Sequence, residues 1–183
     1  THCVDREQVY ATVVTMEGNR GLSGISDIQY DKVQIDPRQI DKSTSFHPLE
    51  KDFAIKEGQR FFTRTIVTDS VFFQLFQYPL VQGSIALDKP ESVLLKENFA
   101  QKMFGTENPI GKTIRHSNGK DLVVEGIIRD PVYKTSFQFD MVISLALSNQ
   151  WERNRVEIYR FMPGTDMEEL NQYGSIPRYF NDP

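Results

Sequence analysis

Alternation of hydrophobic and polar positions predicts several short strands along the chain. Val9, Ala11 and Val13 alternate with Tyr10 and Thr12, a period of two that is typical of a strand. Similar alternation, or short runs of apolar, aromatic and β-branched residues, predicts further strands over 61–67, 93–95 and 156–161.

Two helices are predicted where apolar positions recur at helical spacing. Asp69 stands where it can cap a short helix that runs through Phe76. Residues 97–104 form the second helix, and Gly105 is its C-terminal stop. The apolar side of the second helix consists of Phe99, Ala100, Met103 and Phe104.

Turn residues separate these elements. Asn118-Gly119, between the segments 113–117 and 120–129, predicts a β-hairpin with a type I′ turn. Residues 108–111 (Asn-Pro-Ile-Gly) predict a type I turn with proline second and glycine fourth. Pro131, after Asp130, ends the second strand of the hairpin.

The two ends of the sequence carry weaker signals. Residues 26–49, with Pro37 and Pro48 as breakers, predict mostly a connection with one short element. Pro163-Gly164 predicts a turn, and Thr165-x-x-Glu168 is a capping box that starts a helix ending before Gly174. The fold class is therefore α+β, with short helices packed on small mixed β-sheets.

Composition excludes several function classes. The 183 residues carry a net charge of −4, whereas a nucleic-acid binder needs a basic excess. A single cysteine, Cys3, excludes an intrachain disulfide and a multi-cysteine metal site. No stretch of ~20 apolar residues is present to span a membrane. The chain begins with Thr1 and ends on Asn181-Asp182-Pro183, which predicts a piece of a longer protein.

Each candidate for chemistry has a simpler interpretation. Gly111-Lys112-Thr113 lacks the spacing of a phosphate-binding loop and is interpreted as a turn. Ser23, within Gly21–Gly24, does not match the nucleophile elbow. Three acidic side chains lie at the start of the predicted last helix, where the helix dipole stabilises negative charge, so they need no catalytic role. They are Asp166, Glu168 and Glu169.

The histidines and phenylalanines also favour structural roles. No two of His2, His47 and His116 share a helical turn, so we interpret them as solvated, and a metal site assembled in three dimensions stays open. Phe72, Phe73 and Phe76 are expected in the core, with a protein contact as the alternative if some are exposed. We therefore predict no catalytic, cofactor-binding or metal-binding residues, and the residues alone support an acidic module that binds or transmits.

The order of several motifs resembles a known family. These motifs are Thr68–Phe76, Leu80–Gly83, Ala86–Pro90, Ser92–Ala100, Met103–Gly105, Asn108–Lys112, Val124–Pro131 and Ile158–Asp166. Their sequence and spacing resemble the MacB-like periplasmic core domain of FtsX-type ABC transporter permeases, in a Bacteroidetes-like variant. Lys96 departs from the serine or threonine helix cap that the family often has. Gly126, inside a strand, suggests a bulge or a close backbone approach.

This resemblance implies a fold and a cellular context. Residues 1–68 and 137–183 would form a discontinuous membrane-proximal α/β lobe, and residues 69–136 an inserted membrane-distal lobe with a β-hairpin. The domain would lie in the periplasm, between the first two transmembrane helices of an inner-membrane permease, with its two termini close together. It would be non-catalytic and hold no cofactor.

The resemblance also implies partners. A separate cytoplasmic ATPase would hydrolyse ATP, and the domain would couple that hydrolysis to periplasmic conformational change, as a mechanotransmitter or in export. The permease would work as a dimer, and a periplasmic adaptor could dock on it.

Two alternatives belong to other classes. A free-standing exported ligand-binding or adhesion domain would have an apolar pocket with converging polar groups. A hydrolase assembled across the fold would place a histidine beside a nucleophile in a cleft, with His47 and His116 as its best residues.

Overall fold

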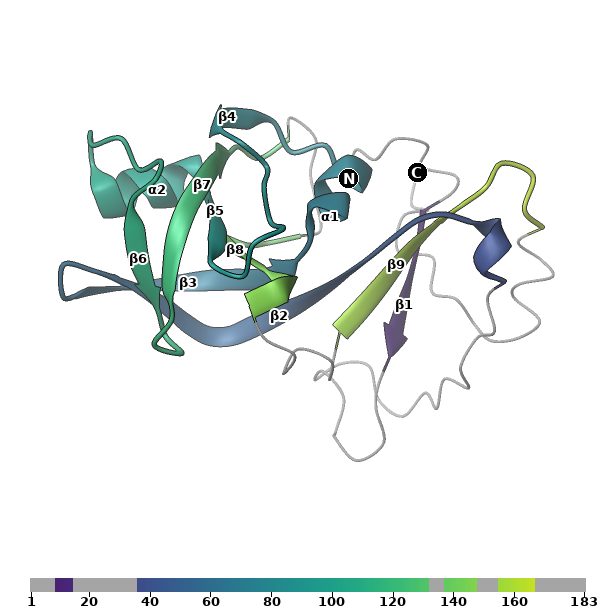
Figure 1. The fold of residues 1–183 in the computed structure, drawn as a ribbon, viewed down its shortest axis with the longest axis horizontal. Coiled ribbons are helices and arrows are strands. Elements are labelled where there is room, and N and C mark those ends of the chain that lie inside the picture. Colours follow the sequence, from purple (N-terminus) through teal and green to yellow (C-terminus); the bar gives the residue numbers. More distant parts are fainter. Residues whose placement is uncertain (1–8, 15–35, 132–136, 148–154, 167–183) are drawn as a thin grey trace.

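The computed structural model describes residues 9–14, 36–131, 137–147 and 155–166. Its strands are β1 (Val9–Val14), β2 (Ile40–Lys56), β3 (Gln59–Thr68), β4 (Leu80–Gly83), β5 (Ser92–Lys96), β6 (Thr113–His116), β7 (Asp121–Ile128), β8 (Met141–Ser144) and β9 (Arg155–Phe161). Its helices are α1 (Ser70–Leu75) and α2 (Glu97–Phe104), with single 3-10 turns at Pro37–Gln39 and Leu145–Leu147. The predicted α+β class is confirmed (Figure 1).

The strands form one mixed sheet that curls back on itself. Its order is β1-β9-β2-β3-β8-β5-β7-β4, and β6 pairs with both β2 and β7. The pairs β3–β8 and β5–β7 are parallel, whereas the other pairs are antiparallel. Because β6 joins β7 to β2, six strands close a ring of pairings, which we call the barrel (β2, β3, β8, β5, β7 and β6).

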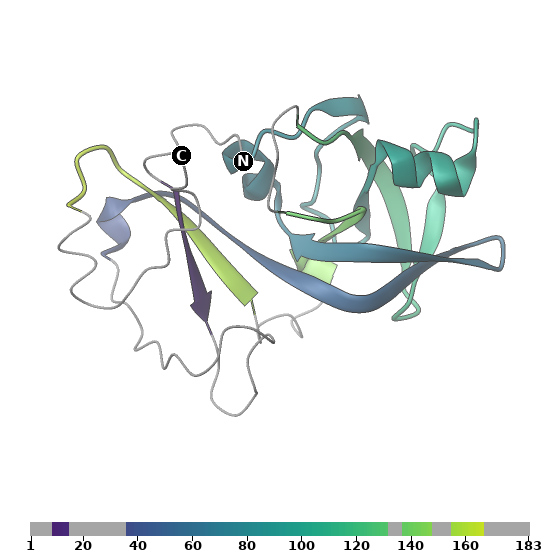
Figure 2. The same cartoon turned by 180° about the vertical axis from the view of Figure 1, so that it is seen from behind.

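Strand β2 joins the barrel to strands β9 and β1, which come from the two ends of the chain. Residues from Ile40 to Phe46 pair with β9, and β9 in turn pairs with β1. Residues from His47 to Lys56 pair with β3 instead. Figures 1 and 2 show β2 running from β1 and β9 into the barrel. The two parts of the molecule therefore share one continuous strand.

The prediction of a connection over 26–49 is wrong for its described part, because β2 begins at Ile40. The polar segment Lys42–Ser45 has no strand signal of its own, and pairing with β9 supplies the backbone partners. Pro48 lies where β2 changes partners, and a bulge follows between Leu49 and Asp52. At such an irregular position a proline is tolerated inside a strand.

Most other predicted elements are confirmed. The helix over 97–104 has the predicted bounds, and Gly105 ends it with a φ of 60°. Asp69 caps α1 as expected. A Cβ at Gly126 would lie 2.3 Å from the carbonyl oxygen of Ser84, which confirms the close approach, and β7 bulges beside it. The predicted helix after Thr165 lies outside the described residues.

Both predicted turn types are wrong, although the turns exist. In the β6–β7 hairpin the His116 carbonyl accepts from the Gly119 N–H, and only Gly119 of the loop has a positive φ. This is a three-residue loop, not a type I′ turn. The other turn closes from the Pro109 carbonyl to the Lys112 N–H, so Gly111, with φ of 77°, is third and proline first.

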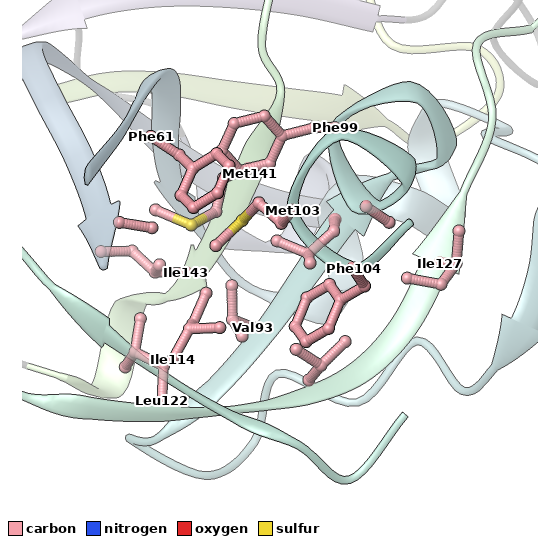
Figure 3. Close-up of a cluster of buried hydrophobic side chains, with 14 of the residues drawn as sticks. Phe61, Val93, Phe99, Met103, Phe104, Ile114, Leu122, Ile127, Met141 and Ile143 are labelled. Atoms are coloured by element: carbon pink, nitrogen blue, oxygen red, sulfur yellow. The ribbon is translucent and has the colours of Figure 1, made fainter. Parts of the chain in front are cut away.

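Two hydrophobic clusters are found among the described residues. The aromatic cluster lies under α1 and centres on Phe72, whose ring contacts six others: Phe46, Phe73, Phe76, Tyr78, Phe137 and Phe139. The barrel cluster lies inside the barrel and under α2 (Figure 3), and it includes Phe61, Val93, Phe99, Met103, Phe104, Ile114, Leu122, Met141 and Ile143. The prediction that Phe72, Phe73 and Phe76 are core is confirmed.

Candidate functional site

A buried acid–histidine pair is the most unusual polar feature of the described residues. Asp52 Oδ2 lies 3.0 Å from His116 Nε2, and the two side chains are 3% and 2% exposed. Ser117 Oγ donates to the other carboxylate oxygen of Asp52 at 2.5 Å. We call these three residues the Asp52 network.

Irregular backbone positions place this network. Asp52 is the first residue to pair with β3 after the bulge in β2, and Lys51 before it has a φ of 54°. His116 is the last residue of β6 and pairs with Ala54, which belongs to the barrel cluster. Side chains of directly paired residues share one face of a sheet, so His116 points into the barrel. The network therefore ties the bulge of β2 to the β6–β7 hairpin.

The electrostatics of the pair favour opposite charges. Burial alone would raise the pKa of Asp52, but hydrogen bonds from His116 and Ser117 outweigh it, and the pKa is lowered. Burial alone would lower the pKa of His116, but Asp52 beside Nε2 outweighs this, and the pKa is raised. The Asn118 N–H points at Nδ1 at 3.3 Å, so a neutral His116 ring carries its proton on Nε2, facing Asp52.

This geometry differs from that of a nucleophile and its base. Ser117 donates to Asp52 and not to the imidazole, so His116 is not placed to deprotonate that hydroxyl. Both donors stabilise the same carboxylate, as in a structural network. The arrangement therefore fastens two parts of the barrel together, and His116 does not activate the Ser117 hydroxyl in it.

Two hydroxyls beside Asp52 are buried, and neither forms a short hydrogen bond with a described residue, although Thr65 lies close enough to Asp52 to help lower its pKa. Thr63 pairs directly with Asp52 in the register of β2 and β3, and Thr65 lies two residues further along the same face. The Thr63 hydroxyl, which has no hydrogen-bond partner among the described residues and lies beside a carboxylate, is suited to bind an internal water. Within 9–14, 36–131, 137–147 and 155–166, no group of three His, Cys, Asp or Glu side chains could hold a metal ion.

The sequence prediction of solvated histidines is wrong for His116, which is buried. No local signal reveals its partner, because Asp52 lies 64 residues away in the chain. His47 is half-buried at the point where β2 changes partners, apart from His116 in the register. His2 lies outside the described residues, and so does Ser23.

The other candidate motifs have structural positions. Gly111-Lys112-Thr113 is the end of a turn that enters β6, as predicted, and Lys112 Nζ binds Glu107 at 2.5 Å. Asp166 is exposed, whereas Glu168 and Glu169 lie outside the described residues. In the described parts of the chain, no helix is long and apolar enough to cross a bilayer.

Comparison with known proteins identifies the family. The family model described as the MacB-like periplasmic core domain matches residues 5–173. The chain belongs to the MacB-like periplasmic core domain family. Sequence comparison with curated proteins found no match.

Solved structures show the same fold as this MacB-like domain. A domain described as part of a permease protein from Porphyromonas gingivalis is 19% identical, with a TM-score of 0.68 over 93% of this chain and 82% of that one. The periplasmic region of MacB from Actinobacillus actinomycetemcomitans is 16% identical, with a TM-score of 0.60 over 73% of this chain and 65% of that one.

A third similar structure is the extracellular domain of the noncanonic ABC-type transporter YknZ from Gram-positive bacteria. It is 14% identical, with a TM-score of 0.56 over 74% of this chain and 71% of that one. The resemblance noted from the motifs is thus confirmed. The MacB-like domain is a periplasmic domain of an inner-membrane ABC transporter permease, which works with transmembrane helices and an ATPase.

Proposed function

We propose that the MacB-like domain is a non-catalytic transmitter. It couples ATP hydrolysis in a cytoplasmic ATPase to conformational change in the periplasm, within a permease dimer. The observation that carries this proposal is the continuity of β2, which pairs with β9 at one end and with β3 at the other. Force applied to β1 and β9 would pass along β2 directly into the barrel.

Side-chain hydrogen bonds at the junction, the part of β2 where its pairing changes from β9 to β3, support rigid transmission. Thr44 Oγ1, on the β9-paired half of β2, donates to Asp69 Oδ1 at 2.8 Å, at the start of α1. Thr68 Oγ1, on β3, donates to the carbonyl of Ser45 at 2.7 Å. The first of these hydrogen bonds is partly buried and the second is buried, and hydrogen bonds shielded from water hold two segments in one arrangement. The junction therefore suits a lever that moves as a unit.

The two-lobe division, 1–68 with 137–183 and 69–136, remains part of the proposal. Val9, at the start of β1, pairs with Arg160, near the end of β9, so the first and last described strands lie side by side. This supports a lobe built from both chain ends and facing one membrane. The division would cut the pairing of β8 with β5, so lobes joined by this pairing would move together.

Distance measurements across the transport cycle test the proposal. Spin labels would be placed at exposed Ser43 and Lys120 in the full permease with its ATPase, after replacement of native cysteines such as Cys3. Within one chain, the Ser43–Lys120 distance should stay constant when ATP is added. Between the two chains of the dimer, the Lys120–Lys120 distance should shift. An intersubunit distance that ATP leaves unchanged would overturn the proposal, and an ATPase variant unable to bind ATP is the control.

A further inference from the structure

The outer face of the β2–β3 hairpin carries an exposed aromatic residue that the transmitter role does not require. Phe62 is 71% exposed, and its ring lies edge-on to that of Phe53, with centroids 6.2 Å apart. Near the other end of β3, Ile66 points to the same face but is buried in the aromatic cluster. The aromatic cluster therefore covers this face of β3 at Ile66 but does not reach Phe62. A ring exposed to this degree is typical of a contact surface when it has charged and apolar neighbours.

The same stretch of β3 also offers a free strand edge. β8 pairs with β3 only from Thr65 to Thr68. Before that point, the Arg64 N–H donates to Asp140 Oδ2 and the Arg64 carbonyl accepts from the Asp140 N–H, so these groups point away from β2. In an antiparallel pair this orientation recurs at every second residue, and so applies to Phe62 and Arg60. No described strand pairs with them there.

Figures 1 and 2 place this edge at an extremity of the molecule. The turn between β2 and β3 lies at one end of the long axis in both views. Proteins usually blunt exposed strand edges with charges, prolines or covering elements. This edge does carry arginines, but the side chain between them is the exposed ring of Phe62, which favours a docking role for this stretch.

The charge of Arg60 indicates which kind of segment would bind at this strand edge. The guanidinium of Arg60 lies over the Phe53 ring, 5.0 Å from its centroid, and forms no ion pair with any described carboxylate. Arg64, on the other side of Phe62, is bound to Asp140. Antiparallel pairing of two copies about Phe62 would place Arg60 of one copy opposite Arg64 of the other, a repulsive pair. An acidic strand would meet the unpaired guanidinium favourably.

We propose that the edge of β3 from Gln59 to Thr63, centred on Phe62, docks an extended acidic segment of a partner protein. Backbone hydrogen bonds to the free edge would hold the segment, and this mode is known as β-augmentation. An apolar side chain of the segment would pack on Phe62 and Phe53, and a carboxylate would pair with Arg60. The assignment rests on the proposed role of the domain within a permease that engages periplasmic partners.

The test measures peptide binding to the full permease in lipid nanodiscs without nucleotide. The probe is a fluorescein-labelled peptide of alternating valine and aspartate, compared with a matched valine–lysine peptide. Fluorescence anisotropy should show binding of the acidic peptide, weakened about tenfold or more by Phe62→Ser or Arg60→Glu. Arg60→Glu should gain binding of the lysine peptide, whereas Phe62→Tyr should retain binding of the acidic one.

Matched controls alter exposed positions elsewhere. Met162→Ser removes another exposed apolar side chain, and Lys120→Glu reverses an exposed charge in the β6–β7 loop, so both should bind like the wild type. Absence of acidic-peptide binding, or equal binding by the Phe62→Ser permease, would overturn the proposal. A loss of subunits from the permease on Phe62→Ser would assign the edge to a second copy instead. Because no ATP is present, failure here is distinguishable from failure of the ATP-dependent distance shift.

Discussion

The two α-helices that the structure describes begin in different ways and rest on different cores. α1 starts with a local cap, because Asp69 Oδ1 accepts from the N–H groups of Val71 and Phe72 at 2.9 and 3.4 Å. The N-cap residue of α2 is Lys96, whose side chain makes no capping hydrogen bond. α1 covers the aromatic cluster, whereas α2 covers the largely aliphatic barrel cluster.

Long-range contacts replace the missing cap of α2. The Lys96 ammonium pairs with Asp130 and lies 4.5 Å from the centroid of the Phe139 ring, within the aromatic cluster. Glu97, in the first turn, binds Arg129 at 2.8 Å. The start of α1 is thus set by its own sequence, and the start of α2 by residues more than 30 positions away. The difference teaches that a weak local signal need not mean a weak element.

The largest expected loss of stability comes from substitutions that distinguish the aromatic cluster from the barrel cluster. Phe72→Ala should lower the free energy of unfolding by about 3–5 kcal/mol, because it removes a fully buried ring that contacts six others. Phe99→Ala, under α2, should cost less, since the structure gives no ring pair for Phe99 among the described residues. Urea unfolding of the domain measures both.

Leucine variants at the same two positions sharpen this test. Phe72→Leu and Phe99→Leu keep most of the apolar volume, so the difference between them reports the ring contacts. A larger loss at Phe99 than at Phe72, for either substitution, would contradict the greater weight given to the aromatic cluster.

The second effect concerns the cap of α1. Asp69→Ala should lower the free energy of unfolding by about 1–2 kcal/mol, because it removes the acceptor for two amide groups and for Thr44. Asp69→Asn keeps a capping oxygen and should recover much of the loss. Thermal unfolding of the three proteins is the measurement, and equal stability of the alanine and asparagine variants would argue against capping.

Much of the fold was predictable wherever the signal is local. Asp69 before an apolar run, Gly105 after one, and Asn118-Gly119 between two strands each indicate an element that the structure contains. The turn types were missed because one or two residues of backbone conformation decide them: Asn118 has no positive φ, so the hairpin loop takes three residues.

The parts that were not predictable depend on distant partners. Residues 42–45 become a strand because β9, over 100 residues later, pairs with them. Asp52 and His116 look like ordinary polar residues until the barrel places them side by side. Phe62 gives no sign in sequence that it is exposed while Phe61 beside it is buried. The docking edge and the Asp52 network thus required the three-dimensional arrangement.

The third effect tests the replacement of the α2 cap. Lys96→Met should lower the free energy of unfolding by about 0.5–1 kcal/mol, because it removes the ammonium from the Phe139 ring and from Asp130 while keeping an apolar stem. Asp130→Asn should cost less, since Asp130 is half exposed and the Phe139 ring still faces the ammonium in that variant. If Lys96→Met matched the wild type in urea unfolding, α2 would need no tertiary contact at its start.

The smallest effect is the pH dependence of the barrel, because burial and Asp52 oppose each other at His116. A raised pKa means that His116 stabilises the fold fully below its ordinary value of 6.5 and loses that contribution as the pH rises through the raised value. Asp52, whose pKa is lowered, loses its contribution only when the pH falls below its ordinary 3.8. Above pH 5.5, therefore, Asp52 stays ionised, and a change with pH in the stability that this pair contributes comes from His116.

The Asp52 network belongs to the barrel and not to the aromatic cluster, so substitutions in the two places should respond differently to pH. His116→Gln keeps a neutral donor, and its cost in urea unfolding should be larger at pH 5.5 than at pH 8.5. Phe72→Ala should cost the same at both pH values, because no titrating group is removed with the ring. If the cost of His116→Gln were instead larger at pH 8.5, the network would owe its stability to the neutral imidazole, and the charge attraction assigned to Asp52 would be wrong.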